Sequence, residues 1–297
     1  MTERLAEVRG RLNGMNQLDA VMNAMAGIAA ARAQQARGQI AAVDAYATNI
    51  AAAMGQIVSQ MPTNGPPPAS PPANRSALVL FGAEQGFVGA FSERVLDAIG
   101  PEISGFDIFL IGSRCQALAG ERGIATTWTS AMPSHSAGLP KLADRIANAI
   151  FSRIQTGEID GLDVVFSRWR AGRVSVERRH LFPVDLSAIP ASSGSQPPLM
   201  NLPAATLLTR LGADYVHALI CNAALHAFAA ENEARMVAMA AARNQIEREL
   251  SSLLATERQV RQEAITAEII ELATGELASQ RDRRSRERRR ARPAGNS

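Results

Sequence analysis

The sequence has 297 residues, more than one mean-sized domain and fewer than three. Apolar residues make up 46% and aromatic residues only 4%, so small aliphatic side chains dominate, above all alanine, which favours long helices. The net charge of +3 hides an uneven distribution: Lys141 is the only lysine, and many arginines lie within 281–297. The rest of the chain is near neutral to acidic, which argues against a protein that binds nucleic acid over its whole surface.

Two cysteines, Cys115 and Cys221, do not form a disulfide framework and fit a reducing compartment. No apolar segment follows a basic start, so we expect no signal peptide. The longest apolar candidate, residues 216–230, contains two histidines and an asparagine and is shorter than the roughly 20 residues of a membrane helix. We therefore expect a soluble or peripheral protein with no membrane span.

Residues 1–61 contain no proline, and their apolar side chains recur at helical spacing. A continuous helix over this range would be roughly 90 Å long. Such a helix needs a second long helix to lie against, so the spacing predicts a coiled coil with a break near Ala33. The predicted seam is formed by Leu5, Val8, Leu12, Met15, Leu18, Met22, Met25, Ala29, Ala36, Ile40, Val43, Ala47, Ile50, Met54, Ile57 and Met61.

A proline-rich linker is predicted at 62–76, followed by a small Rossmann-like α/β domain at 77–190. Short apolar runs that end in glycine, at 77–82 and 107–112, are typical of buried parallel strands. We predict helices at 91–100, 114–123 and 139–158, and later strands at 162–169 and 173–186. A second linker is predicted at 191–203.

A second long helix is predicted at 204–280, because no proline interrupts it and its apolar stripe again steps by three or four residues. An Arg-rich tail at 281–297 follows. The predicted fold is therefore α/β, with a long antiparallel two-helix coiled coil of the N- and C-terminal helices and the α/β domain inserted at one end. The stripe consists of Ile246, Leu250, Leu253, Val260, Ala264 and Ala267.

The loop at 81–91 follows a predicted strand and resembles a phosphate loop, but Gly82, Gly86 and Gly89 have the wrong spacing for a dinucleotide fingerprint. No P-loop motif occurs, because the only lysine, Lys141, is not preceded by the glycines that such a motif requires. A tight structural turn is the favoured interpretation, and we do not expect the chain to hydrolyse ATP by itself.

The histidines His135, His180, His217 and His226 form no metal-binding motif, and Cys115 is better explained as a small buried side chain than as a nucleophile. We therefore predict no catalytic residue, no cofactor and no metal. The Arg-rich tail is either solvated or binds nucleic acid or anionic lipid. Because it has no aromatic residue to stack on bases, we favour the solvated tail and expect no nucleic-acid partner.

Five segments carry a resemblance to the gamma subunit of F-type ATP synthases, the rotating central stalk. "NEARMVAMAAARN" (232–244) and "RQEAITAEIIELATGELA" (261–278) resemble the C-terminal helix of that family. "VMNAMAGIAAARAQQA" (21–36) resembles its N-terminal helix. "GAEQGFVGAFS" (82–92) and "GEIDGLDVVFSRWRAG" (157–172) resemble a turn and a strand of its α/β domain. The matches occur in order from about residue 3 to residue 278.

The resemblance implies a coiled-coil shaft inside a ring of alternating alpha and catalytic beta subunits, with the α/β domain on the membrane c-ring. It also implies an epsilon-type small stalk subunit as a partner and a peripheral position on the cytoplasmic face of the cell membrane. The chain would have no active site of its own and would couple ion flow to ATP synthesis or hydrolysis in the ring. Matching family positions place Met25, Arg235, Gln262 and Thr266 at the interface with the acidic catch loop of the catalytic subunit.

Several positions depart from the family pattern. Ala20 and Asn23 replace two lysines, Asn201-Leu202-Pro203 replaces an aromatic-Glu-Pro sequence, and Arg258 replaces an asparagine. These departures favour a divergent gamma subunit, either of the main ATP synthase or of a second, alternative ion-translocating ATPase. Two rival hypotheses are a free-standing coiled-coil scaffold or adaptor with an α/β head, and a small nucleotide-binding enzyme that uses Gly82–Gly89.

Overall fold

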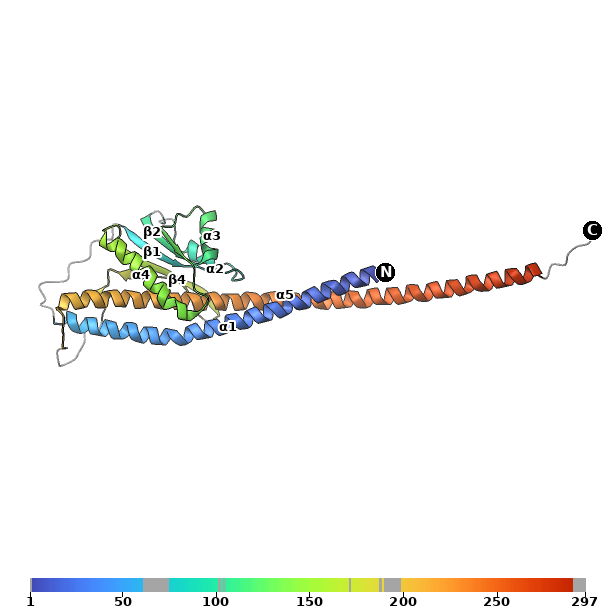
Figure 1. The fold of residues 1–297 in the computed structure, drawn as a ribbon, viewed down its shortest axis with the longest axis horizontal. Coiled ribbons are helices and arrows are strands. Elements are labelled where there is room, and N and C mark those ends of the chain that lie inside the picture. Colours follow the sequence, from blue (N-terminus) through green and yellow to red (C-terminus); the bar gives the residue numbers. More distant parts are fainter. Residues whose placement is uncertain are drawn as a thin grey trace, which may run out of the picture. The chain divides into compact units, whose positions relative to one another are not determined.

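The structure is a computed structural model that describes residues 2–60, 75–100, 103, 105–170, 172–186, 189 and 199–290. Most of both predicted linkers and Met61 lie outside these residues. Two long helices, α1 (Thr2–Val58) and α5 (Ala204–Arg290), begin and end the described chain (Figure 1). Helix α5 continues past residue 280, so the first part of the Arg-rich segment is helical. Together with the sheet described below, the packing of these helices confirms the predicted fold class.

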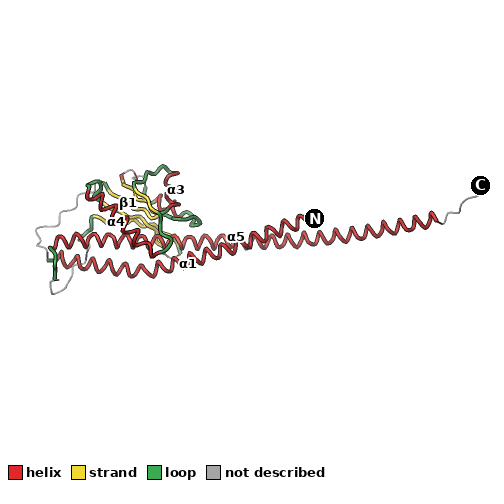
Figure 2. The backbone as a smooth tube through the Cα atoms, viewed as in Figure 1, coloured by secondary structure: helices red, strands yellow, loops and turns green. Residues whose placement is uncertain are grey.

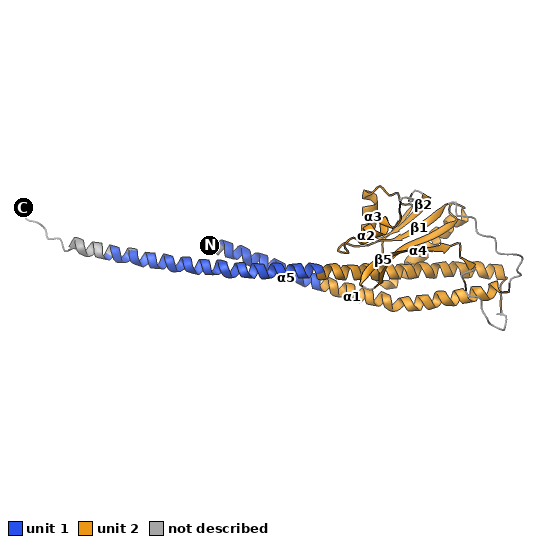
Figure 3. Cartoon of the chain, turned by 180° about the vertical axis from the view of Figure 1, so that it is seen from behind, with its two compact units in different colours: residues 1–23, 241–297 blue, residues 24–240 orange. Residues whose placement is uncertain are grey.

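The chain divides into two compact units, residues 1–23 with 241–297 and residues 24–240 (Figure 3). In the first unit, the start of α1 runs antiparallel to the later part of α5. Arg9 Nε lies 3.0 Å from Glu257 Oε1, and Arg4 Nη1 lies 3.6 Å from Glu263 Oε2. The apolar contact between the two helices is made by Val8, Leu12 and Leu253, with Met15 and Leu250 beside them.

In the second unit, the later part of α1 is again antiparallel to α5. Arg37 Nη1 lies 2.7 Å from Glu233 Oε1, and Asn222 Nδ2 donates to Asp44 Oδ1 at 2.6 Å. Alanine occupies many of the buried positions of α1, and small side chains let two helix backbones approach closely. The buried residues of α1 in this unit are Ala29, Ala33, Ala36, Ala47, Ile50, Ala51, Met54 and Ile57.

One member of the predicted seam was wrong. Leu18 is 47% exposed, whereas Asp19 is half-buried and its Oδ1 lies 3.0 Å from Arg243 Nε. Between Met15 and Met22 the residue that faces the other helix is Asp19 and not Leu18. An ion pair therefore takes the place of the expected apolar contact. The other described seam positions of α1 are buried or half-buried.

A five-stranded sheet with the order β3-β2-β1-β4-β5 forms the centre of the second unit (Figure 2). Strand β1 pairs in parallel with β2 and β4, β2 pairs in parallel with β3, and β5 is antiparallel to β4. The buried parallel strands predicted from the two apolar runs are present. The short strand β3 was missed because it has no apolar run. The strands are β1 (Ser76–Phe81), β2 (Phe106–Ile111), β3 (Trp128–Ser130), β4 (Gly161–Arg170) and β5 (Arg173–Phe182).

Both faces of this sheet are covered, as the near-continuous apolar strands require. One face packs on α4 (Leu139–Gln155) and α5, with Phe81, Phe109 and Phe166 in its core. The other face packs on α2 (Phe91–Asp97) and α3 (Ser113–Glu121). A short 3-10 helix, η2 (Ser136–Gly138), precedes α4. This packing brings the loop after β1 next to the middle of α5.

Candidate functional site

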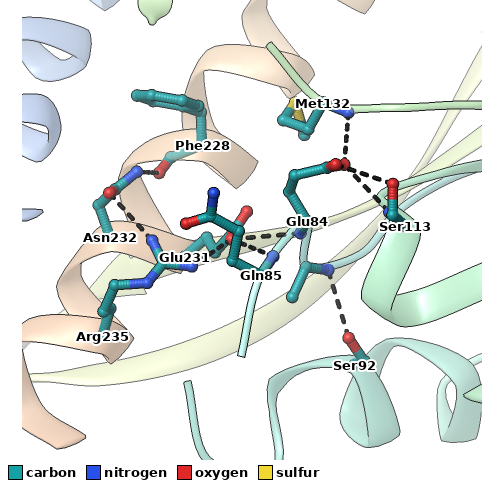
Figure 4. A network of polar contacts seen from close by, with 10 residues as sticks. Glu84, Gln85, Ser92, Ser113, Met132, Phe228, Glu231, Asn232 and Arg235 are labelled. Atoms are coloured by element: carbon teal, nitrogen blue, oxygen red, sulfur yellow. Dashed lines mark hydrogen bonds and ion pairs between the residues drawn. The ribbon is translucent and has the colours of Figure 1, made fainter. Parts of the chain in front are cut away.

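A polar cluster with several buried members lies where α5 meets the loop after β1 (Figure 4). Glu84, in that loop, accepts three hydrogen bonds. Ser113 donates from its backbone N–H at 3.0 Å and from its hydroxyl at 2.8 Å, and the Met132 N–H donates at 2.8 Å. Glu84 therefore connects the loop to the first residue of α3 and to the chain beyond β3.

Two glycines allow the loop to approach its neighbours closely. A Cβ on Gly82 would lie 2.2 Å from the Cβ of Cys115, and Gly112 has a φ of +107°. A Cβ on Gly112 would lie 2.6 Å from the carbonyl oxygen of Gly82. The residue after β1 thus packs against the side chain of Cys115 in α3, and the residue after β2 packs against the backbone of Gly82 and Ala83, which leaves no room for a Cβ at either glycine.

Glu231 of α5 completes the cluster. One of its carboxylate oxygens accepts the backbone N–H groups of Glu84 at 3.2 Å and Gln85 at 3.4 Å, and it receives Arg235 Nη2 at 2.6 Å. Arg235 Nη1 donates to Asn232 Oδ1 at 3.1 Å, and Asn232 Nδ2 donates to the carbonyl oxygen of Phe228 at 2.8 Å. The side chains of Glu231, Asn232 and Arg235 are all buried.

The electrostatics of this cluster are those of a buried ion pair. Burial raises the pKa of Glu231, while Arg235 and the two loop amides act in the opposite direction. The loop amides that a phosphate would need therefore donate to a carboxylate of the chain itself. This geometry supports the interpretation of residues 81–91 as a structural turn.

The four predicted interface residues lie in different local environments. Met25 is half-buried and Arg235 is buried in the second unit, whereas Gln262 and Thr266 are exposed in the first unit. The Thr266 hydroxyl donates to the carbonyl oxygen of Gln262 at 2.9 Å, within the same helix. The Nε of Arg235 has no hydrogen-bond partner among the described residues. The contact of all four with a catalytic subunit stays a prediction.

Glu231 was missed in the sequence, although a signal for it exists. A glutamate four residues before an arginine on a helix forms a favourable pair. This pair interrupts a stretch of α5 that is otherwise rich in alanine, and charged residues at buried positions need partners. Glu84 carried no comparable signal, because its contacts come from α3 and the chain after β3.

The cysteines are not poised to act as nucleophiles. Burial raises the pKa of Cys115 to about 11 and that of Cys221 to about 11, so both thiols are protonated near neutral pH. Among the described residues, no group of three or more His, Cys, Asp or Glu side chains could hold a metal ion.

The later part of α5 presents a different feature, a set of large apolar side chains that the described residues of the first unit leave exposed. Each of them is more than half exposed, although Arg4 Nη1 lies 3.6 Å from Glu263 Oε2, two residues before Ile265. Large exposed apolar patches mark interaction surfaces, and this segment of α5 is a candidate for one. These residues, named here the apolar tip, are Ile265, Ile269, Ile270, Leu272 and Leu277.

Comparison with known proteins identifies the family. A family model described as ATP synthase matches residues 4–278. The chain belongs to the ATP synthase gamma-chain family. The gamma chain of Frankia casuarinae is 28% identical over 93% of this chain and 97% of its own length. That of Streptomyces avermitilis is 26% identical over 94% and 97%.

Solved structures of this family share the fold. A chain of the Euglena gracilis mitochondrial ATP synthase, from an assembly of OSCP, F1 and c-ring, matches with a TM-score of 0.60. It is 13% identical, and the match covers 95% of this chain and 97% of that one. A chain from the central stalk and c-ring of the Tetrahymena thermophila enzyme matches with a TM-score of 0.54 over 75% and 99%. None of the helices in the described part of the chain is both long and apolar enough to cross a membrane.

Proposed function

We propose that this gamma chain is the shaft that couples ion flow through a membrane c-ring to ATP synthesis or hydrolysis in a ring of alpha and beta subunits. The observation that carries the proposal is the apolar tip, which is exposed on the later part of α5 in a chain of the gamma family. A surface of this kind requires an apolar surrounding. The inner wall of a ring supplies one.

The mechanism follows from differential contact. A ligand or partner shifts an equilibrium only when it contacts two states differently. A shaft with different side chains on each side favours a different state in each catalytic subunit that it faces. Because reciprocal coupling is a thermodynamic necessity, binding in the ring also favours one orientation of the shaft. The ATP chemistry belongs to the ring.

The proposed partners are the alpha and beta subunits at α1 and α5, the c-ring at the α/β domain, and an epsilon-type small stalk subunit. The proposed location is the cytoplasmic face of the cell membrane, as a peripheral part of the complex. Met25, Arg235, Gln262 and Thr266 are the proposed contacts with the catalytic subunits. Gln262 and Thr266 are exposed, which supports their availability to a partner.

For Arg235 the structure adds a condition, because both of its Nη groups already donate inside the chain. A carboxylate of the catalytic subunit would have to reach its Nε or compete with Glu231 for an Nη group. We propose that Arg235 exchanges between Glu231 and that carboxylate as the shaft turns.

The function is tested by placing charges on the apolar tip. The double variant Ile269→Asp and Leu272→Asp, in a tagged chain expressed in its native host, should lose most of its alpha and beta subunits on purification. The matched control is Glu271→Gln, an exposed residue of the same segment. If the double variant retains both subunits as fully as the control, the tip does not lie in a ring.

A further inference from the structure

We propose that one face of the β4–β5 hairpin binds a multivalent oxyanion, of which inorganic phosphate is the simplest. The face carries four arginines, Arg168, Arg170, Arg173 and Arg179, around the single glutamate Glu177. None of these five residues belongs to the hydrogen-bonded cluster at Glu231, and the inference does not depend on the proposed coupling function.

The strand register places these side chains on the same face of the sheet. Arg170 is directly opposite Arg173, and Arg168 is directly opposite Ser175. Alternate residues of a strand share a face, so Glu177 and Arg179 of β5 continue the row. Like charges directly opposite each other in an antiparallel pair are destabilising. The pairing of Arg170 with Arg173 therefore calls for a counter-charge.

The chain itself supplies too little of that charge. Glu177 lies 3.0 Å from Arg170, 3.5 Å from Arg168 and 3.8 Å from Arg179, measured between carboxylate oxygens and guanidinium nitrogens. Within the described residues, Arg173 makes no ion pair. One carboxylate is thus shared by three guanidinium groups, and a fourth lies on the same face.

A buried histidine on α5 provides the second, independent observation. The His226 ring stacks on Phe166 with 5.9 Å between ring centroids, and the Arg179 guanidinium carbon lies 5.3 Å from the Phe166 ring centroid. His226 is 9% exposed, and its Nε2 has no hydrogen-bond partner among the described residues. Burial and then the charges of Arg168, Arg179 and Arg170 lower the pKa of His226 to about 4. Excess positive charge therefore extends to the helix that packs on this face.

The chemistry of the ligand follows from these groups. A guanidinium group is a planar fork of donors that matches two oxygens of a phosphate, and it keeps its charge at every relevant pH. The side chains of Arg168, Arg179 and Arg170 are 26%, 37% and 62% exposed, so a ligand from solvent can reach them. A divalent anion neutralises more of the excess charge than a monovalent one does.

The test uses the full chain with its histidines isotopically labelled for NMR. Only four histidines occur in the chain, and the variant His226→Gln identifies the signal of His226. Potassium phosphate is added near neutral pH, with potassium chloride of the same ionic strength as the reference. We expect a saturable change in the His226 signal with phosphate and no saturable change with chloride.

Two double variants locate the site. Arg170→Gln with Arg173→Gln should weaken phosphate binding about tenfold or more. Arg94→Gln with Arg114→Gln removes the same charge from two exposed arginines on α2 and α3 and should leave the binding unchanged. The proposal is overturned if phosphate acts only as chloride does, or if both double variants respond to phosphate alike.

Discussion

Glu231 has three N–H donors from two elements around one carboxylate oxygen and almost no contact with water. A buried charge of this kind is stable only while its partners stay in place. Its value to the protein is geometric, because Glu231 joins the middle of α5 to the loop after β1. The same contacts hold Arg235, which the family pattern places at the interface with the catalytic subunit.

Removing Arg235 should therefore cost stability. We expect Arg235→Ala to lower the free energy of unfolding by about 3–5 kcal/mol, because Glu231 is left buried and unpaired. The deficit should shrink at acidic pH, since the pKa of Glu231 is raised by burial and the carboxyl becomes neutral there. Urea denaturation of the purified chain measures both effects. Arg122→Ala, which removes an exposed pair with Asp97, is the control and should change the midpoint little.

His226 gives the chain a pH dependence of the opposite sign. Its pKa is lowered to about 4 in the folded chain from an ordinary value of 6.5, so folding favours the neutral ring. Its stabilising contribution is complete above pH 6.5 and is lost as the pH falls through about 4. The loss amounts to at most about 3 kcal/mol. The free energy of unfolding, measured by denaturation at several pH values between 6.5 and 4, should fall more with decreasing pH for the natural chain than for His226→Phe. An equal fall for both chains would contradict the assignment.

The two thiols should be slow to react while the chain is folded. Because the pKa of both Cys115 and Cys221 is raised to about 11 by burial, little thiolate exists at mildly alkaline pH. We expect iodoacetamide to alkylate neither cysteine in the folded chain and both after denaturation in urea, as measured by mass spectrometry. Rapid alkylation of either cysteine in the native chain would show that its element opens readily.

Among the elements, the contact between the end of β1 and α3 has little tolerance for added volume. Gly82→Ala should lower the free energy of unfolding by about 1–3 kcal/mol, because the new Cβ would lie 2.2 Å from that of Cys115. Gly86→Ala is a control in the same loop, where an added Cβ meets nothing within 4 Å. Thermal denaturation of both variants checks the prediction, and equal midpoints would mean that the loop shifts to accommodate the methyl group.

The sequence predicts best those helices and strands whose pattern lies within their own segment. The long helices and the buried strands β1 and β2 follow from periodicity and apolar runs. Strand β3 has only Trp128, Thr129 and Ser130, and it is a strand because it pairs with β2. The sequence of the N-terminal helix does not show whether Leu18 or Asp19 faces the C-terminal helix. Asp19 faces it because its carboxylate pairs with Arg243 of that helix.

The candidate site was predicted less completely than the fold. Arg235 was singled out through the family pattern, but the partners that bury it were not. Glu84 and Glu231 are far apart in the sequence, and their contact exists only because the α/β domain packs against α5. Spacing within one segment contains no information on contacts of this range.

At the scale of the whole molecule, the sequence relationship over residues 4–278 and the shared fold lead to one account. The chain is a gamma-family stalk whose helix α5 presents the exposed apolar tip. A free-standing scaffold with the same helices would be expected to associate with itself. A stalk should instead be found with a ring of other subunits.

The most direct measurement is affinity purification of the tagged chain from its native membranes, with subunit amounts from quantitative mass spectrometry and ATPase activity recorded. The account predicts two large subunits, each in roughly threefold excess over this chain, together with ATPase activity. Recovery of the chain alone, or only with copies of itself, from the soluble fraction would contradict the stalk function.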